Sequence, residues 1–356
     1  MVGLETGSGQ LLLTGATGFL GGAIAAAALE AGWRLRVAAR DPSALDARPW
    51  GAHPALDVRR IDLAAPEARA ALDAALDGVD AVIHAAGAMA GDDAAHRRDT
   101  VEPTRTLVDA MTARDAPPLL VLISSFTVYN YASMPIGAGL DETTPLEPEP
   151  GLRDAYCRAK LAQEALVRAA AQRDGLRARA LRPGAIVGPG RLRTARLGFA
   201  IGPLLLMPGG GAPVPVIGVE DCAALALRAT AAPAPERSDV PVLEGEGWFE
   251  AVNLVDPDQP DQKTYAAAIR RAAGPRLALR LPLGLVRAPA RVIALAGLLA
   301  PGLARRAPGP FRLETFDARF KPLRFSAARA QDRLGWRPTR PFEDTLRGFL
   351  KRGDAR

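Results

Sequence analysis

A tyrosine and a lysine, Tyr156 and Lys160, stand four residues apart in a stretch that predicts a helix over Ala155–Arg173. Residues at this spacing share one face of a helix. A phenol with its ordinary pKa of about 10 is a poor acid–base group at neutral pH. A nearby ammonium favours the ionised phenol. The pair can therefore move a proton, with Tyr156 exchanging it and Lys160 lowering the tyrosine pKa.

Two adjacent serines follow an apolar stretch upstream of this pair. The stretch Leu119–Ile123 predicts a strand, and Ser124 and Ser125 come directly after it. Open α/β sheets bind ligands at the carboxyl ends of their strands, so a hydroxyl placed here would reach a bound substrate. A tyrosine–lysine pair alone is common on helix surfaces, but this ordered combination favours a catalytic set of Ser125, Tyr156 and Lys160.

A glycine-rich turn near the N-terminus supplies the features of a dinucleotide site. The sequence TGATGFLG at 14–21 places Gly15, Gly18 and Gly21 between a predicted strand and a predicted helix. The first glycine permits a tight turn, the second lets amides approach a pyrophosphate, and the third lets the helix pack closely on the strand. Unpaired amides at the helix start favour phosphate charge. This context predicts a bound nicotinamide dinucleotide.

The end of the second predicted strand bears on the choice between NAD and NADP. An acidic residue about 20 residues after the turn binds the ribose 2′-hydroxyl of NAD. Here Ala39 and Arg40 stand at that point, followed by Asp41. A small residue leaves space for a 2′-phosphate, and a guanidinium matches it in charge and geometry. We expect NADP(H) as the preferred cofactor, with NAD(H) as the alternative if Arg40 is only a solvated loop residue.

Short apolar stretches alternate with alanine-rich helical stretches over the first 190 residues. This alternation predicts βαβ units on a parallel sheet whose two faces are both covered by helices. The predicted strands are Leu11–Leu13, Leu35–Ala38, Val58–Ile61, Ala81–His84, Leu119–Ile123 and Ala178–Leu181, and the predicted helices are Leu20–Ala31, Glu67–Leu76, Thr100–Arg114 and Ala155–Arg173. The expected fold class is α/β, a Rossmann-type doubly wound parallel sheet with a smaller, mostly C-terminal substrate lobe.

The alternation of apolar and alanine-rich stretches ends at about residue 190, and proline and glycine become frequent. Proline and glycine punctuate 183–218, and 276–325 is apolar but rich in proline. We expect residues 1–190 to form the nucleotide-binding Rossmann domain, with 214–242 returning to it. Residues 191–213 and 243–356 are expected to form the substrate-binding lobe and C-terminal elements.

Composition narrows the classes of partner. The net charge of +6 suits an anionic ligand or a negatively charged surface, but the arginines are scattered, which argues against nucleic-acid binding. The two cysteines, Cys157 and Cys222, have no metal-site spacing, so we expect no metal and a reducing, cytoplasmic location. The apolar stretch Val292–Ala304 is shorter than the roughly 20 residues of a membrane span, so no transmembrane helix is expected.

Taken together, these motifs resemble the extended short-chain dehydrogenase/reductases, the NAD(P)-dependent epimerase/dehydratase family, with a likeness to the hydroxysteroid dehydrogenase and dihydroflavonol reductase branch. The resemblance extends over almost the whole chain. It rests on TGATGFLG, the strand-end pair Asp62–Leu63, HAAG at 84–87, SSFTVYN at 124–130, YCRAK at 156–160, RPGAIVGPG at 182–190, VEDCAALAL at 219–227 and LGWRP at 334–338.

The resemblance implies a role for each matching residue. Ser125 would bind the substrate oxygen, with Ser124 as the fallback, while Tyr156 would move the proton and Lys160 would bind the nicotinamide ribose. The implied cofactor-binding residues are Gly15, Thr17, Gly18, Phe19, Leu20, Gly21, Arg40, Asp62, Leu63, Ala85, Ala86, Gly87, Ser124, Tyr156, Lys160, Pro183, Gly184, Ala185 and Ile186. A homodimer is implied by resemblance alone.

The sequence departs from the family pattern at two places. Where the family often has an asparagine on the fourth helix, TVEPT at 100–104 supplies Thr100, so a proton relay through that helix is in doubt. Sugar-nucleotide members often carry an asparagine in an RxxNxYGP stretch. The corresponding Ala185 cannot make that hydrogen bond, which counts against a sugar-nucleotide substrate.

Three functions remain open. The leading hypothesis is NADP(H)-dependent interconversion of a secondary alcohol and a ketone on a largely apolar small molecule, whose pocket the apolar segments Leu197–Met207 and 276–310 could wall. Those segments could equally form a packed core or a dimer contact. The alternative is a sugar-nucleotide epimerase or dehydratase with tightly bound NAD, in which Arg191, Arg193 and Arg196 clamp a diphosphate. The third is a non-catalytic NADP-binding subunit, a class that tends to lose the Tyr–Lys pair.

Overall fold

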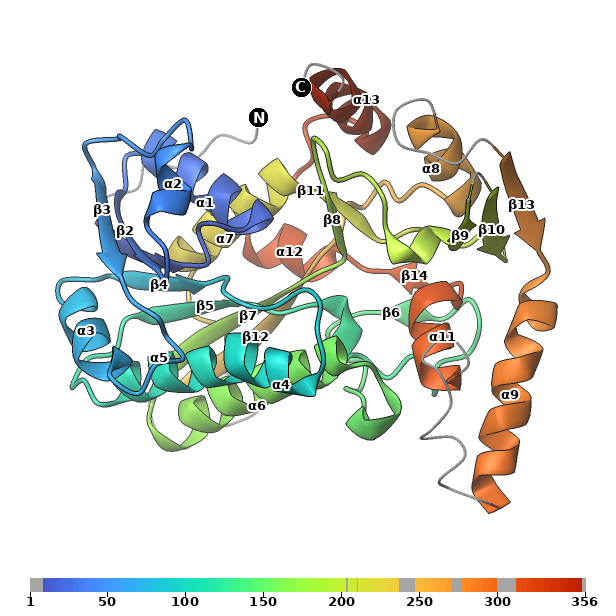
Figure 1. The fold of residues 1–356 in the computed structure, drawn as a ribbon, viewed down its shortest axis with the longest axis horizontal. Helices are drawn as coiled ribbons and strands as arrows, with labels where there is room; N and C mark the ends of the chain where they lie inside the picture. Colours follow the sequence, from blue (N-terminus) through green and yellow to red (C-terminus); the bar gives the residue numbers. More distant parts are fainter. Residues whose placement is uncertain are drawn as a thin grey trace.

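A computed structural model of the chain describes residues 9–202, 204–209, 211–236, 247–270, 277–299 and 312–353. A large layered unit adjoins a smaller lobe of short strands and helices (Figure 1).

The large unit is built on a parallel sheet. In the described residues this sheet has seven strands in the order β12-β7-β5-β4-β1-β2-β3. They are β1 (Gln10–Thr14), β2 (Arg34–Ala39), β3 (Leu56–Arg60), β4 (Ala81–His84), β5 (Leu119–Ile123), β7 (Arg177–Pro183) and β12 (Trp248–Leu254). The strand order reverses between β1 and β4, and a doubly wound sheet binds its ligand at such a switch point.

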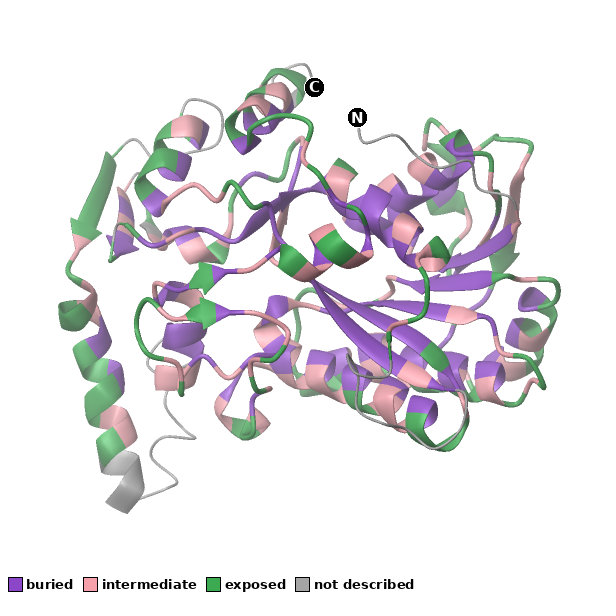
Figure 2. Ribbon diagram, turned by 180° about the vertical axis from the view of Figure 1, so that it is seen from behind, coloured by how far each residue is buried: buried purple, intermediate pink, exposed green. Residues whose placement is uncertain are grey.

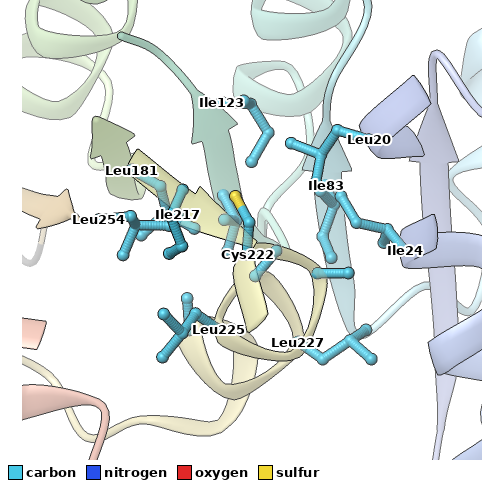
Figure 3. Close-up of a cluster of buried hydrophobic side chains, with 14 of the residues drawn as sticks. Leu20, Ile24, Ile83, Ile123, Leu181, Ile217, Cys222, Leu225, Leu227 and Leu254 are labelled. Carbon is cyan, nitrogen blue, oxygen red and sulfur yellow. The ribbon is translucent and has the colours of Figure 1, made fainter. Parts of the chain in front are cut away.

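Helices cover both faces of this sheet. The helices of the large unit are α1 (Phe19–Glu30), α2 (Ser43–Asp46), α3 (Ala68–Ala75), α4 (Asp93–His96), α5 (Glu102–Thr112), α6 (Ala155–Arg173), α7 (Val219–Ala231) and α12 (Ala328–Arg333). Helices α1 and α7 bury one face and α3, α5 and α6 the other. Figure 3 shows the first of these cores, where Leu20 and Ile24 of α1 approach Ile83 of β4 and Cys222 of α7.

The smaller lobe is made of short strands and peripheral helices. Strand β8 (Ala185–Val187) pairs with β11 (Val216–Gly218), and β6 (Gly139–Leu140) pairs with β14 (Arg324–Phe325). A third sheet has the order β13-β10-β9, from β9 (Phe199–Ile201), β10 (Leu204–Pro208) and β13 (Leu277–Leu281). The helices here are α8 (Gln262–Ile269), α9 (Leu283–Leu299), α11 (Leu313–Phe320) and α13 (Phe342–Gly353).

The predicted fold class is confirmed, and the predicted strands and helices all occur within a few residues of their expected ends. Two local features add detail to these expectations. Strand β12 lies at an edge of the central sheet beside β7, within the range 243–356 that was expected to hold the substrate-binding lobe and C-terminal elements. The helix expected over Thr100–Arg114 begins with a wide π-helical turn, Arg97–Val101, just before Pro103, whose missing N–H interrupts regular helical bonding.

Among the described residues, none of the helices is long and apolar enough to cross a membrane. Over the same residues, histidine, cysteine and carboxylate side chains do not gather into groups of three or more that could hold a metal ion.

Candidate cofactor and active site

The glycine turn after β1 holds the backbone in close contact with the end of β4. Gly15 has a φ of +80°, and a Cβ added there would lie 2.6 Å from the amide nitrogen of Ala86. A Cβ added at Gly21 would lie 2.0 Å from the carbonyl oxygen of Gly15. Neither position has room for a side chain. The turn therefore requires glycine for its conformation at Gly15 and for helix–turn packing at Gly21.

A cavity of about 240 Å³ opens beside this turn at the carboxyl ends of the strands. Its lining residues are Gly15, Ala16, Thr17, Gly18, Ala38, Ala39, Arg40, Ile61, Asp62, Leu63, Ala64, Ala85, Ala86, Gly87, Ala88, Arg98, Asp99 and Pro103. Gly18 caps helix α1 without a side-chain hydrogen bond, so the first amides of the helix remain available to an anion. The residues present thus fit an elongated, phosphate-bearing dinucleotide.

One end of the cavity carries two guanidiniums joined by one carboxylate. Arg40 and Arg98 both donate to Asp99, at 2.8 Å and 2.6 Å, and both arginine side chains are largely exposed. The hydrogen bond from Arg98, with the charges of both guanidiniums, holds the pKa of Asp99 below its ordinary value. Asp62 also lines the cavity and acts on Arg98, so the two guanidiniums here are balanced by two carboxylates.

The carboxyl end of β5 and the start of α6 bring the predicted catalytic residues together. Asp154 caps α6 by accepting a hydrogen bond from the amide of Cys157 at 2.9 Å, which places Tyr156 in the first turn and Lys160 in the second. The Ser125 hydroxyl lies beside the Tyr156 phenol, where it acts to lower the tyrosine pKa. The Lys160 ammonium lies 6.0 Å from the centre of the Tyr156 ring.

The Lys160 side chain is buried and held by uncharged acceptors. Its Nζ donates to the carbonyl oxygen of Ile123 at 2.8 Å and to Oε1 of Gln163 at 2.9 Å. A Cβ added at Gly87, which lines the cavity, would lie 3.6 Å from the same Nζ. Burial lowers the pKa of Lys160 to about 8. The lysine thus sits behind the cavity floor with a charge that no carboxylate directly neutralises.

The pKa of Tyr156 is raised above its ordinary value in this structure, chiefly by burial, and the neighbouring Ser125 hydroxyl opposes the increase. The lowering expected from Lys160 is not seen, because the ammonium points at Ile123 and Gln163 rather than at the phenol. Sequence reasoning also missed His96, whose ring meets that of Tyr156 edge-on with centroids 6.0 Å apart.

A chain of uncharged hydrogen bonds runs from Gln163 into the core. Gln163 donates to Oγ1 of Thr104 at 2.6 Å, Thr104 contacts Nε2 of His84 at 2.9 Å, and Nδ1 of His84 contacts Thr14 at 2.7 Å. Burial lowers the pKa of His84 to about 3, with a smaller effect of Lys160, so the imidazole is neutral. Thr100 stands beside this chain and accepts from the amide of Ala88 at 2.9 Å.

Ser124 does not point toward the cavity. Its hydroxyl donates to Glu164 at 2.5 Å inside the protein, and Glu164 forms a two-pronged ion pair with Arg182. Burial lowers the pKa of Arg182, but the Glu164 carboxylate and the Tyr129 hydroxyl more than offset it, so the pKa is raised. The fallback role of Ser124 as the substrate-binding hydroxyl is therefore disfavoured relative to Ser125.

The cavity gathers half of the predicted cofactor residues. Gly15, Thr17, Gly18, Arg40, Asp62, Leu63, Ala85, Ala86 and Gly87 line it, while Phe19, Leu20, Gly21, Ser124, Tyr156, Lys160, Pro183, Gly184, Ala185 and Ile186 lie outside its lining. Arg98, Asp99 and Pro103 line it without having been predicted. Arg98 and Asp99 come from the π-helical turn and Pro103 from the start of α5, far from Arg40 in sequence, and no spacing rule would have identified them.

Comparison with known proteins places the chain in a family. The model of the NAD dependent epimerase/dehydratase family matches residues 11–240, which is more than half of the chain. This protein belongs to that family. The match ends near α7 and includes the glycine turn, the strand-end serines and the Tyr–Lys pair. The membership predicted from the motifs is confirmed.

Two curated relatives are similar to about half of this family member. It is 31% identical over 196 residues to a 3 beta-hydroxysteroid dehydrogenase/Delta 5-->4-isomerase of Mycobacterium tuberculosis (strain ATCC 25618 / H37Rv), covering 52% of this chain and 50% of that protein. It is 30% identical over 190 residues to the uncharacterized protein y4nG of Sinorhizobium fredii, covering 53% and 44%. The chain thus spans about half the length of the curated relatives it matches.

Solved structures share the fold at lower identity. The UDP-glucuronic acid 4-epimerase of Bacillus cereus in complex with NAD has a TM-score of 0.67 and 16% identity, covering 97% of this chain and 99% of that one. MoeE5 in complex with UDP-glucose and NAD has a TM-score of 0.65 and 20% identity, covering 98% and 99%. At these identities the likeness establishes the fold of the family member and no more.

Proposed function

We propose that this protein is an NADP(H)-dependent oxidoreductase that interconverts a secondary alcohol and a ketone on a largely apolar small molecule. The observation that supports this proposal most strongly is that Ser125 and Tyr156 lie side by side at the carboxyl end of the sheet, with the buried Lys160 one helical turn further along α6. The dinucleotide supplies hydride acceptance and donation when bound. Tyr156 exchanges the alcohol proton, and Ser125 holds the substrate oxygen beside it.

Two exposed guanidiniums at the cavity beside Ala39 support NADP(H) over NAD(H). Arg40 and Arg98 both approach Asp99, and Ala39 leaves space where a carboxylate would repel a 2′-phosphate. Because Asp99 already engages Arg40, the guanidinium would be shared between Asp99 and the phosphate. Arg98, which sequence reasoning did not find, is the second cation available there.

Two observations support an apolar substrate. The relative at 31% identity is named as a hydroxysteroid dehydrogenase and isomerase. In addition, Arg196, one of the three arginines considered as a diphosphate clamp, is already engaged. It donates to the Tyr131 hydroxyl at 2.8 Å, and its guanidinium lies over the rings of Tyr131 and Phe325. The same contacts weaken the sugar-nucleotide alternative.

Identification of the nucleotide released on denaturation tests the first part of the proposal. Purified protein without stoichiometric nucleotide, binding NADPH more tightly than NADH, is the expected result. Arg40→Ala should then weaken NADPH binding about tenfold or more and leave NADH nearly unchanged, with Arg69→Ala on α3, outside the cavity lining, as the control. Stoichiometric, tightly held NAD would contradict the proposal that NADP(H) exchanges at every turnover, and would favour the sugar-nucleotide epimerase or dehydratase hypothesis.

A panel of apolar ketones, followed by NADPH absorbance, tests the chemistry. Tyr156→Phe should lower turnover by about 10²–10⁴-fold while NADPH binding stays nearly intact, because only the transferable proton is removed. Turnover that survives this substitution would contradict the role of Tyr156. Cofactor binding without turnover on any member of the panel would instead favour the non-catalytic subunit.

A further inference from the structure

The exposed aliphatic side chains of this protein gather in one part of the fold. Among the described residues, eight large hydrophobic side chains are highly exposed, and six of them belong to β9, β13 and α9. These six, which we call the α9 surface, are Ile201 (60% exposed), Leu277 (64%), Leu279 (49%), Leu285 (69%), Val292 (64%) and Leu295 (65%). Single exposed hydrophobics are ordinary, but a cluster on one lobe marks an interaction site.

The strand pairing places the sheet members of the α9 surface side by side. Leu277 and Leu279 of β13 stand opposite Leu204 and Leu206 of β10, and Ile201 of β9 stands opposite Leu204. Paired residues project from the same face of a sheet. Ile201, Leu277 and Leu279 therefore share one face of the β9-β10-β13 sheet with Leu204 and Leu206, and Figure 2 shows β13 exposed along its length. On the same face, Phe199 is covered by Phe320 of α11.

Helix α9 is apolar on two opposite sides, and only one of them is covered by the rest of the described chain. On the covered side Ala290 packs with Phe316 and Phe320 of α11, and Arg287 pairs with Asp317. Leu285, Val292 and Leu295 follow a spacing of seven and three, which places them together on the other side. Helix α9 continues β13 along the outer edge of the molecule in both views (Figures 1 and 2).

The charge of this segment indicates what covers it. Between Asp261 and Glu314 the sequence has no acidic residue and ten basic ones, namely Lys263, Arg270, Arg271, Arg276, Arg280, Arg287, Arg291, Arg305, Arg306 and Arg312. This excess is larger than the net charge of +6 of the whole chain, so the remainder of the protein is net acidic. Of the described members, Lys263, Arg270, Arg280 and Arg291 are exposed.

We propose that the α9 surface docks on an anionic phospholipid membrane, with α9 lying along the interface. The exposed apolar face of α9 lies in a sequence segment that has arginines and no acidic residue, which is the character of an interfacial helix. Its aliphatic side chains would enter the acyl boundary, and the exposed cations would meet lipid phosphates. A second copy of the chain is a poorer partner, because two segments each carrying this positive excess would repel one another. The proposal stands on the lobe alone and does not depend on the proposed reaction.

Vesicle flotation tests this docking with the full-length protein. The wild type should float with vesicles containing about 30% phosphatidylserine in phosphatidylcholine, remain unbound with pure phosphatidylcholine, and detach as salt rises. The triple variant Leu285→Gln/Val292→Gln/Leu295→Gln should bind the phosphatidylserine vesicles at least about tenfold more weakly than the wild type. Arg291→Glu should also weaken binding, since it reverses a charge beside the apolar stripe.

A matched control separates this surface from general stickiness. Ile136 is 58% exposed but lies outside the α9 surface, so Ile136→Gln should float as the wild type does. The altered side chains are exposed, so unchanged circular dichroism and NADPH binding should accompany each variant. Equal binding to neutral and anionic vesicles, no binding to either, or a wild-type dimer that the triple variant makes monomeric would overturn the proposal.

Discussion

Lys160 and Glu164 lie one turn apart on α6, and both side chains are almost wholly buried. They differ in their partners, because Glu164 has an oppositely charged partner and Lys160 has only uncharged acceptors. Glu164 is held by both prongs of Arg182 and by Ser124, so its charge is neutralised inside the core. Lys160 meets only the carbonyl of Ile123 and the amide oxygen of Gln163. Glu164 and Arg182 thus form a buried ion pair with a structural role. Lys160 instead keeps a charge next to the cavity, and burying that charge lowers the free energy of unfolding.

The largest effect on stability should come from breaking the buried ion pair between Glu164 and Arg182. Glu164→Ala leaves the Arg182 guanidinium buried beside Tyr129 without its carboxylate, and loss of one partner of a buried pair typically costs about 3–5 kcal/mol. Urea unfolding followed by circular dichroism measures this change. Glu164→Gln keeps the shape and should cost less. A loss in Glu164→Ala no larger than that of a surface substitution would contradict the structural role of the pair.

Lys160→Met should have the opposite effect on stability while abolishing most turnover. At pH 7 both folded and unfolded wild-type protein hold the lysine proton, and the folded state bears the full cost of the buried charge. As pH rises from about 8 toward 10.5, the folded state loses that proton while the unfolded state keeps it. The wild-type unfolding free energy therefore rises in this window, relative to the variant, by roughly 3 kcal/mol.

Unfolding of both proteins in urea at several pH values between 7 and 10.5 checks this prediction, because other titrating groups cancel in the difference. The methionine leaves two acceptors, on Ile123 and Gln163, without the ammonium, which offsets part of its gain at pH 7. A difference between wild type and variant that does not change with pH would show that the folded-state pKa of Lys160 is not lowered.

The adjacent serines Ser124 and Ser125 also divide into one residue with a structural role and one at the active site. Ser125→Ala removes the partner of Tyr156 and should lower turnover about a hundredfold with little change in stability. Ser124→Ala takes one hydrogen bond from Glu164 and should cost about 1–3 kcal/mol of unfolding free energy, with turnover nearly preserved. Kinetics and urea unfolding of the two variants separate the roles. The reverse assignment would restore Ser124 as the catalytic hydroxyl.

Much of this site was accessible from local sequence signals. Gly15, Gly18 and Gly21 mark the turn because only glycine fits its backbone, and the spacing of Tyr156 and Lys160 reports a shared helix face. The contrast between Ser124 and Ser125 was not accessible, since which hydroxyl turns inward depends on Glu164, forty residues away. Arg98 and Asp99 were missed for a similar reason: a π-helical turn, not a repeating pattern, carries them to the cavity. The location of β12 also depended on long-range pairing that no local pattern records.

A substitution at Gln163 should have the smallest effect, because it changes only the partner of Lys160 and leaves Glu164 and Arg182 as they are. Its Oε1 accepts from Lys160 and its Nε2 donates to Thr104. Gln163→Glu changes little in shape but gives Lys160 a carboxylate partner of the kind that Arg182 already has. The pKa of Lys160 should then rise, by about one unit, because an adjacent opposite charge favours the protonated amine. The alkaline limb of the pH–rate profile should move upward accordingly, with the wild type and Gln163→Met as references. An unmoved limb in Gln163→Glu would mean that the titration of Lys160 does not govern turnover, and the buried lysine would then act only through its position.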